Sequence, residues 1–161
     1  MAHRAARPHI AVIGSSEASE AQLEQARAVG LALARAGAVL ICGGLGGVML
    51  GACEGARAGG GTTVAILPGG DRSSANPYVD VAIATGMGEL RNGLIVRAAD
   101  ALIAIGGGWG TLSEIAFAMR TGRPLVALED HGLPAAHGHT IEVFPDPQRA
   151  VDRALSLAGV R

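Results

Sequence analysis

The chain has 161 residues, a length typical of a single domain, and its formal net charge is −1. With arginines scattered along the chain, this charge predicts neither a nucleic-acid surface nor a polybasic membrane contact. No apolar run reaches the roughly 18 residues that a membrane span needs, and the start lacks the long apolar stretch of a signal peptide. Two cysteines without CxxC spacing predict reduced thiols, so we expect a cytoplasmic protein.

Short apolar runs alternate with longer stretches of helical periodicity. The expected strands cover residues 9–14, 38–42, 62–67, 79–85, 101–105, 124–128 and 140–144. The expected helices cover the segment between Ser19 and Gly37 and residues 48–57, 89–98, 111–120 and 146–159. Ser19 and Gln22 have the spacing of a capping box at the first helix. Residues 1–8 are expected to fray, and residues 132–139 to be irregular.

Continuous apolar strands that alternate with helices indicate a parallel sheet covered on both faces. We therefore predict one α/β domain over residues 1–161, a Rossmann-like three-layer αβα sandwich with a mostly parallel sheet of about six or seven strands. Right-handed crossovers bring the strand-to-helix loops to one edge, where ligands bind in such sheets. The loops after Ile13, Cys42, Leu67 and Ile105 therefore form the expected crevice.

The strongest feature is a glycine loop that follows the fifth expected strand and runs into a helix. It contains Gly107, Gly108 and Gly110, with Trp109 inside the loop and Thr111 after it. Glycines let successive backbone N–H groups approach an anion, and the helix N-terminus adds unpaired donors. The loop therefore predicts a phosphate site, although it lacks the GK[ST] of a P-loop. The alternative is a tight strand–helix turn without a ligand.

Two further loops at this edge have related composition. The loop after the second strand contains four glycines: Gly43, Gly44, Gly46 and Gly47. The loop after the first strand offers backbone donors and hydroxyls and is not a GxGxxG fingerprint: Gly14, Ser15 and Ser16. We expect these loops to share one anion site.

Three polar side chains and one tryptophan accompany the loops. Arg91, followed by Asn92, could pair bidentately with a phosphate, and the alternative is a solvated helix arginine. Glu114 could accept hydrogen bonds from ligand hydroxyls, or it could only close a capping box with Thr111. Trp109 could stack on a ligand ring or pack against a partner subunit.

A group of histidines is a weaker candidate. His131, His137 and His139 lie in one loop near Glu129, but their spacing fits no ordered set of metal ligands. We therefore predict a polar surface loop and no metal site. Cys42, at the end of a strand, is interpreted as a small buried hydrophobe.

The segment GGGWGTLSE at residues 106–114 resembles the PGGxGTxxE signature of Lonely Guy proteins in the lysine decarboxylase-like superfamily. Arg91 precedes Asp100 by nine residues, as in that family, and residues 42–49 are similar to its upstream glycine loop. The resemblance covers about residues 9 to 128 and implies a nucleoside-monophosphate phosphoribohydrolase. It implies catalytic roles for Arg91 and Glu114 and a phosphate loop made of Gly107, Gly108, Gly110 and Thr111.

Two positions depart from the signature. Gly106 replaces its proline, and Asn92 replaces the lysine that follows the family's arginine. These residues are more similar to a sister branch that includes molybdenum-cofactor carrier proteins and is related to the Rossmann part of DNA processing protein A. That likeness implies binding of a pterin phosphate without cleavage.

The leading expectation is therefore a binding or carrier protein for a phosphorylated nucleotide-like or pterin ligand, with the molybdenum cofactor or a nucleoside monophosphate as ligand. Two alternatives stay open: a phosphoribohydrolase, which would not be a lysine decarboxylase, and a non-catalytic nucleotide-sensing oligomer. No cofactor is required for the fold. The resemblance implies a homodimer or homotetramer, and the charge and composition predict no nucleic-acid or membrane partner.

Overall fold

The computed structural model describes residues 6–132 and 140–159. Its centre is a seven-stranded sheet in which every neighbouring pair is parallel, in the order β4-β3-β2-β1-β5-β6-β7. The strands are β1 (His9–Gly14), β2 (Val39–Cys42), β3 (Thr62–Leu67), β4 (Val81–Ala84), β5 (Ala101–Ile105), β6 (Leu125–Ala127) and β7 (Glu142–Val143). The predicted α/β class is confirmed, and the sheet is wholly parallel.

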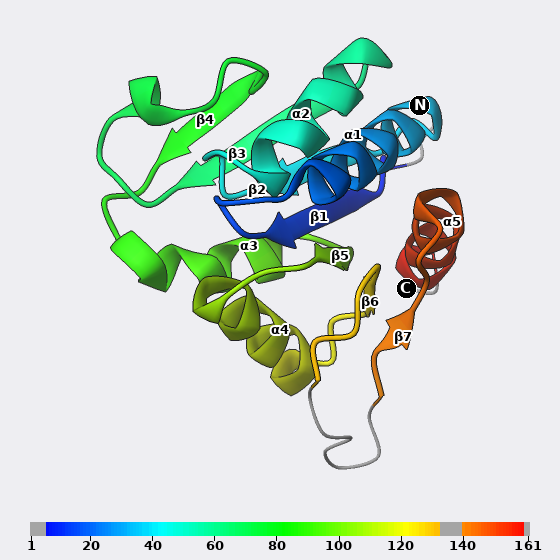
Figure 1. Ribbon diagram of the computed structural model, residues 1–161. Coiled ribbons are helices and arrows are strands. Elements are labelled where there is room, and N and C mark those ends of the chain that lie inside the picture. Colours follow the sequence, from blue (N-terminus) through cyan, green and yellow to red (C-terminus); the bar gives the residue numbers. More distant parts are fainter. Residues whose placement is uncertain (1–5, 133–139, 160–161) are drawn as a thin grey trace, which may run out of the picture.

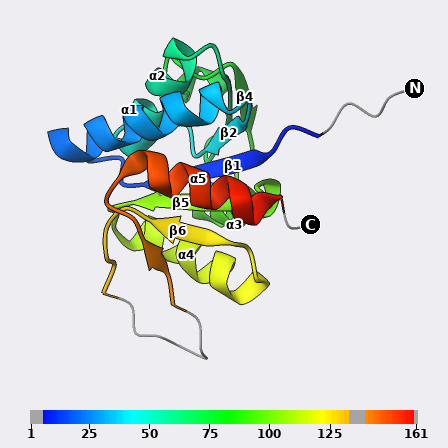
Figure 2. The same cartoon turned by 90° about the vertical axis from the view of Figure 1, so that its right-hand side faces the viewer.

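Helices cover both faces of this sheet (Figures 1 and 2). They are α1 (Glu20–Arg35), α2 (Val48–Ala58), α3 (Asn92–Ala98), α4 (Trp109–Thr121) and α5 (Pro147–Ala158), with 3-10 turns η1 (Arg72–Ser74) and η2 (Gly88–Arg91). Helices α1, α2 and α5 pack on one face, and α3 and α4 on the other. The result is the predicted three-layer arrangement.

The helix ends follow local signals where side chains supply them. Ser19 Oγ accepts from Gln22 N at 3.2 Å while Ser19 N donates to Gln22 Oε1 at 3.0 Å, so the predicted capping box is present. Gly37, with φ of +75°, follows the C-cap of α1. Arg7 donates to the carbonyls of Gly37 and Ala38, so the fraying expected up to residue 8 is not seen at this position.

Several boundaries differ from the predicted ones. The edge strand β4 is shorter than predicted, and β7 has two residues. The predicted helix over residues 89–98 begins as the 3-10 turn η2. Helix α4 starts two residues earlier than predicted, at Trp109. Most of the irregular segment 132–139 lies outside the described residues. Within the described part, no helix is both long and apolar enough to cross a membrane.

Helices α1 and α2 touch through their backbones. A Cβ at Gly30 would lie 2.0 Å from Ala52 O, and one at Gly55 would lie 2.0 Å from Arg27 O. Only glycine allows this approach, so the two helices pack closer than side chains permit. Each of these helices follows a loop at the carboxyl edge of the sheet. Their close packing therefore fixes the positions of the two loops relative to each other.

Candidate functional site

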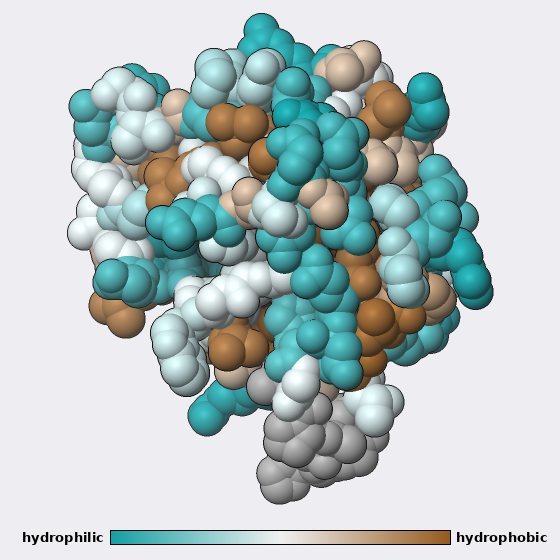
Figure 3. Space-filling view, in the orientation of Figure 1, coloured by the Kyte–Doolittle hydropathy of each residue, from teal (hydrophilic) through white to brown (hydrophobic). Residues whose placement is uncertain are grey.

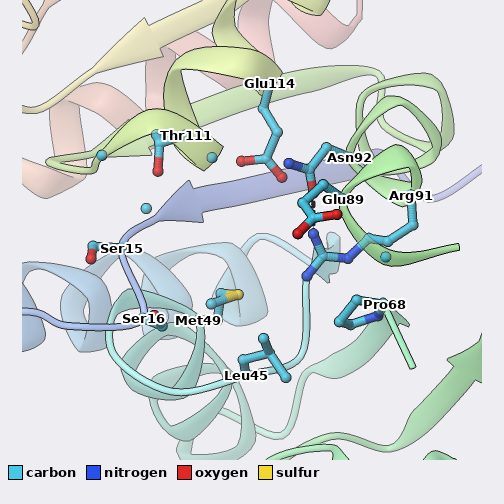
Figure 4. Close-up of a pocket in the computed structure, with 14 residues that line it drawn as sticks. Ser15, Ser16, Leu45, Met49, Pro68, Glu89, Arg91, Asn92, Thr111 and Glu114 are labelled. Atoms are coloured by element: carbon cyan, nitrogen blue, oxygen red, sulfur yellow. Dashed lines mark hydrogen bonds between the residues drawn. The ribbon is translucent and has the colours of Figure 1, made fainter. Parts of the chain in front are cut away.

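A cavity of about 380 Å³ opens at the carboxyl edge of the sheet. There the strand order reverses, since β1 has β2 on one side and β5 on the other. The lining comes from the loops after β1, β2, β3 and β5, from η2 and from the N-terminal parts of α2, α3 and α4 (Figure 4): Gly14, Ser15, Ser16, Leu45, Met49, Pro68, Gly88, Glu89, Arg91, Asn92, Gly108, Gly110, Thr111 and Glu114. All four loops that the sequence placed at the crevice contribute.

The structure brings most of the predicted site residues together. Nine of them line the cavity: Gly14, Ser15, Ser16, Arg91, Asn92, Gly108, Gly110, Thr111 and Glu114. Six do not: Gly43, Gly44, Gly46, Gly47, Gly107 and Trp109. Sequence reasoning missed five lining residues: Leu45, Met49, Pro68, Gly88 and Glu89. Leu45 lies between the predicted glycines, and Pro68 directly follows a predicted strand, so the sequence position of each residue indicates the crevice.

One end of the cavity is the N-terminus of α4. Gly108 is its N-cap and makes no side-chain cap hydrogen bond. The first bond inside the helix runs from Leu112 N to Gly108 O at 3.0 Å, so the preceding N–H groups have no acceptor within the helix. Ser15 and Thr111 lie at this end (Figure 4). Unpaired N–H groups, hydroxyls and the positive end of the helix dipole together suit an anion.

Gly107 shapes this end without lining it. Its φ is +128°, and a Cβ there would lie 2.3 Å from Thr111 Oγ1. Both facts require glycine. Because the helix starts at Trp109, Thr111 is not its cap, and the predicted capping box between Thr111 and Glu114 is wrong.

The glycine loop after β2 packs against the loops around the cavity. Gly44 O accepts from Asn76 N at 2.8 Å, and Leu45 O accepts from Asn76 Nδ2 at 3.0 Å. Val48 N, at the start of α2, already donates to Ser15 O at 3.0 Å. A Cβ at Gly47 would lie 2.2 Å from Ser15 O. Gly47 therefore allows this loop to pack closely against the loop after β1.

Arg91 lies at the other end of the cavity, and most of its donors are already used. The residue is 8% exposed. Its Nε donates to Ile66 O at 2.8 Å, Nη2 donates to Gly43 O at 3.4 Å, and Nη1 donates to Asn92 Oδ1. Three of the five guanidinium N–H groups are thus occupied, which leaves two for a ligand. Burial lowers the pKa of Arg91, while the charge of Glu114 opposes this effect.

Glu114 points into the cavity from α4 (Figure 4) and is 7% exposed. Within the described residues its carboxyl group accepts no hydrogen bond. Burial raises its pKa to about 8, although the charge of Arg91 works in the opposite direction. At neutral pH Glu114 is therefore mostly protonated and is a hydrogen-bond donor. Glu89, which also lines the cavity, is exposed.

The remaining candidate residues lie outside the cavity. Trp109 is 88% exposed. His131 Nε2 lies 2.8 Å from Gly106 O, while His137 and His139 fall outside the described residues. No group of three or more metal-ligating side chains occurs in the described part of the chain. Cys42 Sγ lies 3.5 Å from Cys53 Sγ, and both are buried free thiols.

Solved structures provide three informative comparisons. The molybdenum cofactor binding protein of Rippkaea orientalis has a TM-score of 0.88 and 33% identity, covering 95% of this chain and 98% of that one. The molybdenum cofactor carrier protein of Chlamydomonas reinhardtii has a TM-score of 0.80 and 30% identity, covering 94% and 98%. DNA processing protein A from Streptococcus pneumoniae, at 20% identity, shares the fold alone, with a TM-score of 0.72, over 92% of this chain and 62% of that one.

Comparisons of the sequence add one relative and one protein family to these structural comparisons. An uncharacterized protein of Archaeoglobus fulgidus is 44% identical over 147 residues, which cover 91% of this chain and 94% of that protein. The family model described as the SLOG cluster4 family matches residues 7–157. The predicted relation to molybdenum-cofactor carrier proteins is thus confirmed, DNA processing protein A shares the fold, and the chain belongs to the SLOG cluster4 family.

Proposed function

We propose that this protein binds a phosphorylated small molecule with a ring system, the molybdenum cofactor or a nucleoside monophosphate, and carries it without cleaving it. The observation that carries the proposal is the cavity itself. It is lined by the N-terminus of α4, which has no side-chain cap, by hydrogen-bond donors and by apolar side chains. The likeness to proteins described as binding or carrying the molybdenum cofactor supports the same role.

In this proposal the phosphate lies on the first N–H groups of α4, beside Ser15 and Ser16. The ring lies against Leu45, Met49 and Pro68, which supply apolar surface. These residues fit a pterin phosphate, because they offer an anion cradle and a flat apolar contact within one mononucleotide-sized space. In that case molybdenum would be part of the cargo. Trp109, next to the cradle, would cover the ring only after its side chain has turned inward.

A phosphoribohydrolase is the second candidate, and the unpaired carboxyl group of Glu114 favours it. Cleavage of an N-glycosidic bond builds positive charge on the sugar, which an ionised carboxylate stabilises. With its pKa raised to about 8, Glu114 is mostly neutral at pH 7, which is the form of a general acid rather than of that stabilising carboxylate. The carrier is preferred because Asn92 stands where the hydrolase signature has a lysine.

Two measurements separate these functions. Native mass spectrometry of freshly purified protein tests for a bound pterin, and a thermal-shift screen with orthophosphate, AMP and molybdopterin tests for binding, which raises stability by mass action. A turnover assay on AMP then measures base release. Release that Glu114→Gln abolishes would replace the carrier with the enzyme, and absence of binding across the panel would refute both.

We also propose that the protein forms a homo-oligomer through the layer of α3 and α4. Large apolar side chains remain exposed on this side of the sheet: Val81, Ile83, Leu90, Leu94 and Phe117. Apolar surface is visible over the turn that precedes α3 (Figure 3). Light scattering after gel filtration should report more than one copy per particle, and Phe117→Asp should shift it toward the monomer. A wild-type monomer would refute this proposal.

A further inference from the structure

A chain of hydrogen bonds connects Arg91 to the first turn of α4. Arg91 Nη1 donates to Asn92 Oδ1, and Asn92 Nδ2 donates to Ser113 Oγ at 3.0 Å. Ser113 Oγ in turn donates to Gly110 O at 2.6 Å. All donors in this chain point the same way, from a cation to a carbonyl, so each bond polarises the next.

This hydrogen-bonded path links η2 and the start of α3 to the first turns of α4. Arg91 also holds Ile66 O at the end of β3 and Gly43 O at the end of β2. Through Asn92 and Ser113, the ends of these strands are connected to α4, whose first turn forms the anion cradle. Both ends of the cavity are therefore joined through one polar path.

Ser113 holds a special position in this path. A serine hydroxyl often donates to a carbonyl one turn back in a helix, and Thr121 Oγ1 donates in this way to Phe117 O at 2.7 Å near the end of α4. Ser113 differs because it also accepts a hydrogen bond from another helix. With its only proton committed to Gly110 O, it can offer Asn92 only a lone pair, which fixes the orientation of the Asn92 amide.

Building on the proposed function, we infer that Ser113 is a positioning residue: it fixes the Asn92 amide with its N–H side toward α4 and holds the first turn of α4 where it can bind an anion. Without the hydroxyl, Asn92 Nδ2 loses its acceptor, and only the bond from Arg91 Nη1 still orients the amide. The amide and the first turn of α4 are then held less firmly, so loss of one hydroxyl outside the cavity lining weakens binding inside it.

The protein contains only two asparagines, Asn76 and Asn92, so a selective labelling test is simple. Protein labelled with ¹⁵N-asparagine gives two pairs of side-chain amide signals, one pair for each residue. In Ser113→Ala we expect the Asn92 signal to shift and exchange faster with solvent while the Asn76 signal stays unchanged. Backbone amides of residues 109–112 should also exchange faster. These readouts need no ligand.

Affinity provides the second readout. We expect Ser113→Ala to bind orthophosphate and AMP about three- to tenfold more weakly, the effect of one lost hydrogen bond. Ser113→Thr restores the hydroxyl and should recover both affinity and the Asn92 signal. Thr121→Val removes the comparable hydroxyl at the far end of α4 and should change neither.

Each outcome is decisive. An unchanged Asn92 signal in Ser113→Ala would overturn the inference, and so would a shifted signal with unchanged exchange in the first turn of α4. Equal affinity of Ser113→Ala and wild type would also overturn it. If the wild type binds no phosphate compound, the proposed function fails separately, and the amide signals still decide whether Ser113 positions the turn.

Discussion

Replacing the buried acid Glu114 by glutamine should make the folded protein more stable, increasingly so as pH rises. The pKa of Glu114 is raised from 4.5 to about 8 in the folded state. A group with a raised folded-state pKa contributes stability that is fully present below its unfolded pKa and is lost as pH rises through the folded pKa. The unfavourable contribution of Glu114 therefore grows between about pH 4.5 and pH 8, and glutamine, which stays neutral, removes it.

The magnitude follows from the size of the shift. One pKa unit corresponds to about 1.4 kcal/mol, so the ionisable group costs close to nothing at pH 4.5, about 3 kcal/mol at pH 7 and about 4 to 5 kcal/mol at pH 9. In a chain of this length, the pH 7 value corresponds to a melting temperature roughly 6–12 °C higher for Glu114→Gln.

Urea unfolding followed by far-UV circular dichroism at these pH values measures the effect. The informative quantity is how the stability difference between variant and wild type changes with pH, because the other carboxylates contribute equally to both proteins. Glu89→Gln is the matched control, since Glu89 lines the same cavity but is exposed. A pH-independent difference for Glu114→Gln would show that this carboxyl group titrates as in water.

Three further outcomes are expected. Phosphate affinity should fall by about tenfold between pH 7.5 and pH 9.5, because Glu114 becomes an anion near the bound one; titration calorimetry with Glu114→Gln, which should show no such fall, checks this. Gly107→Ala should cost about 1–3 kcal/mol of unfolding free energy and lower phosphate affinity, since its Cβ would meet Thr111 Oγ1 at a positive φ, whereas Gly70→Ala, with open space around it, should be neutral. The fluorescence of Trp109, the only tryptophan, should be quenched freely by acrylamide in the free protein and less after AMP binds; equal quenching would remove Trp109 from the site.

Much of the fold could be predicted because its signals are local. Buried parallel strands are continuous apolar runs, and Ser19 carries its cap signal in its own side chain. The start of α4 was misplaced because its cap, Gly108, has no side chain to signal it. The short strand β7 pairs with a single neighbour, so little in its own sequence sets its length.

The candidate site was predictable in position and less so in detail. Loops at the ends of strands meet by topology, which is why Ser15, Arg91 and Glu114 were found. Two of the acceptors around Arg91, the carbonyl oxygens of Ile66 and Gly43, come from distant parts of the chain, and no spacing reveals them. The raised pKa of Glu114 has the same origin, since burial is a property of the folded chain. Expectations of a cytoplasmic location and of no nucleic-acid partner stay predictions.

The glycine contact between α1 and α2 has a practical consequence for redesign. Because Gly30 and Gly55 leave no room for a methyl group, the helix pair is a frame that tolerates no exchange at these two points. Met49 at the start of α2 and Leu45 in the loop before it line the cavity and lie outside these two contacts. A library that varies Leu45 and Met49 while leaving both glycines untouched could therefore alter which ring the protein accepts and keep the scaffold intact.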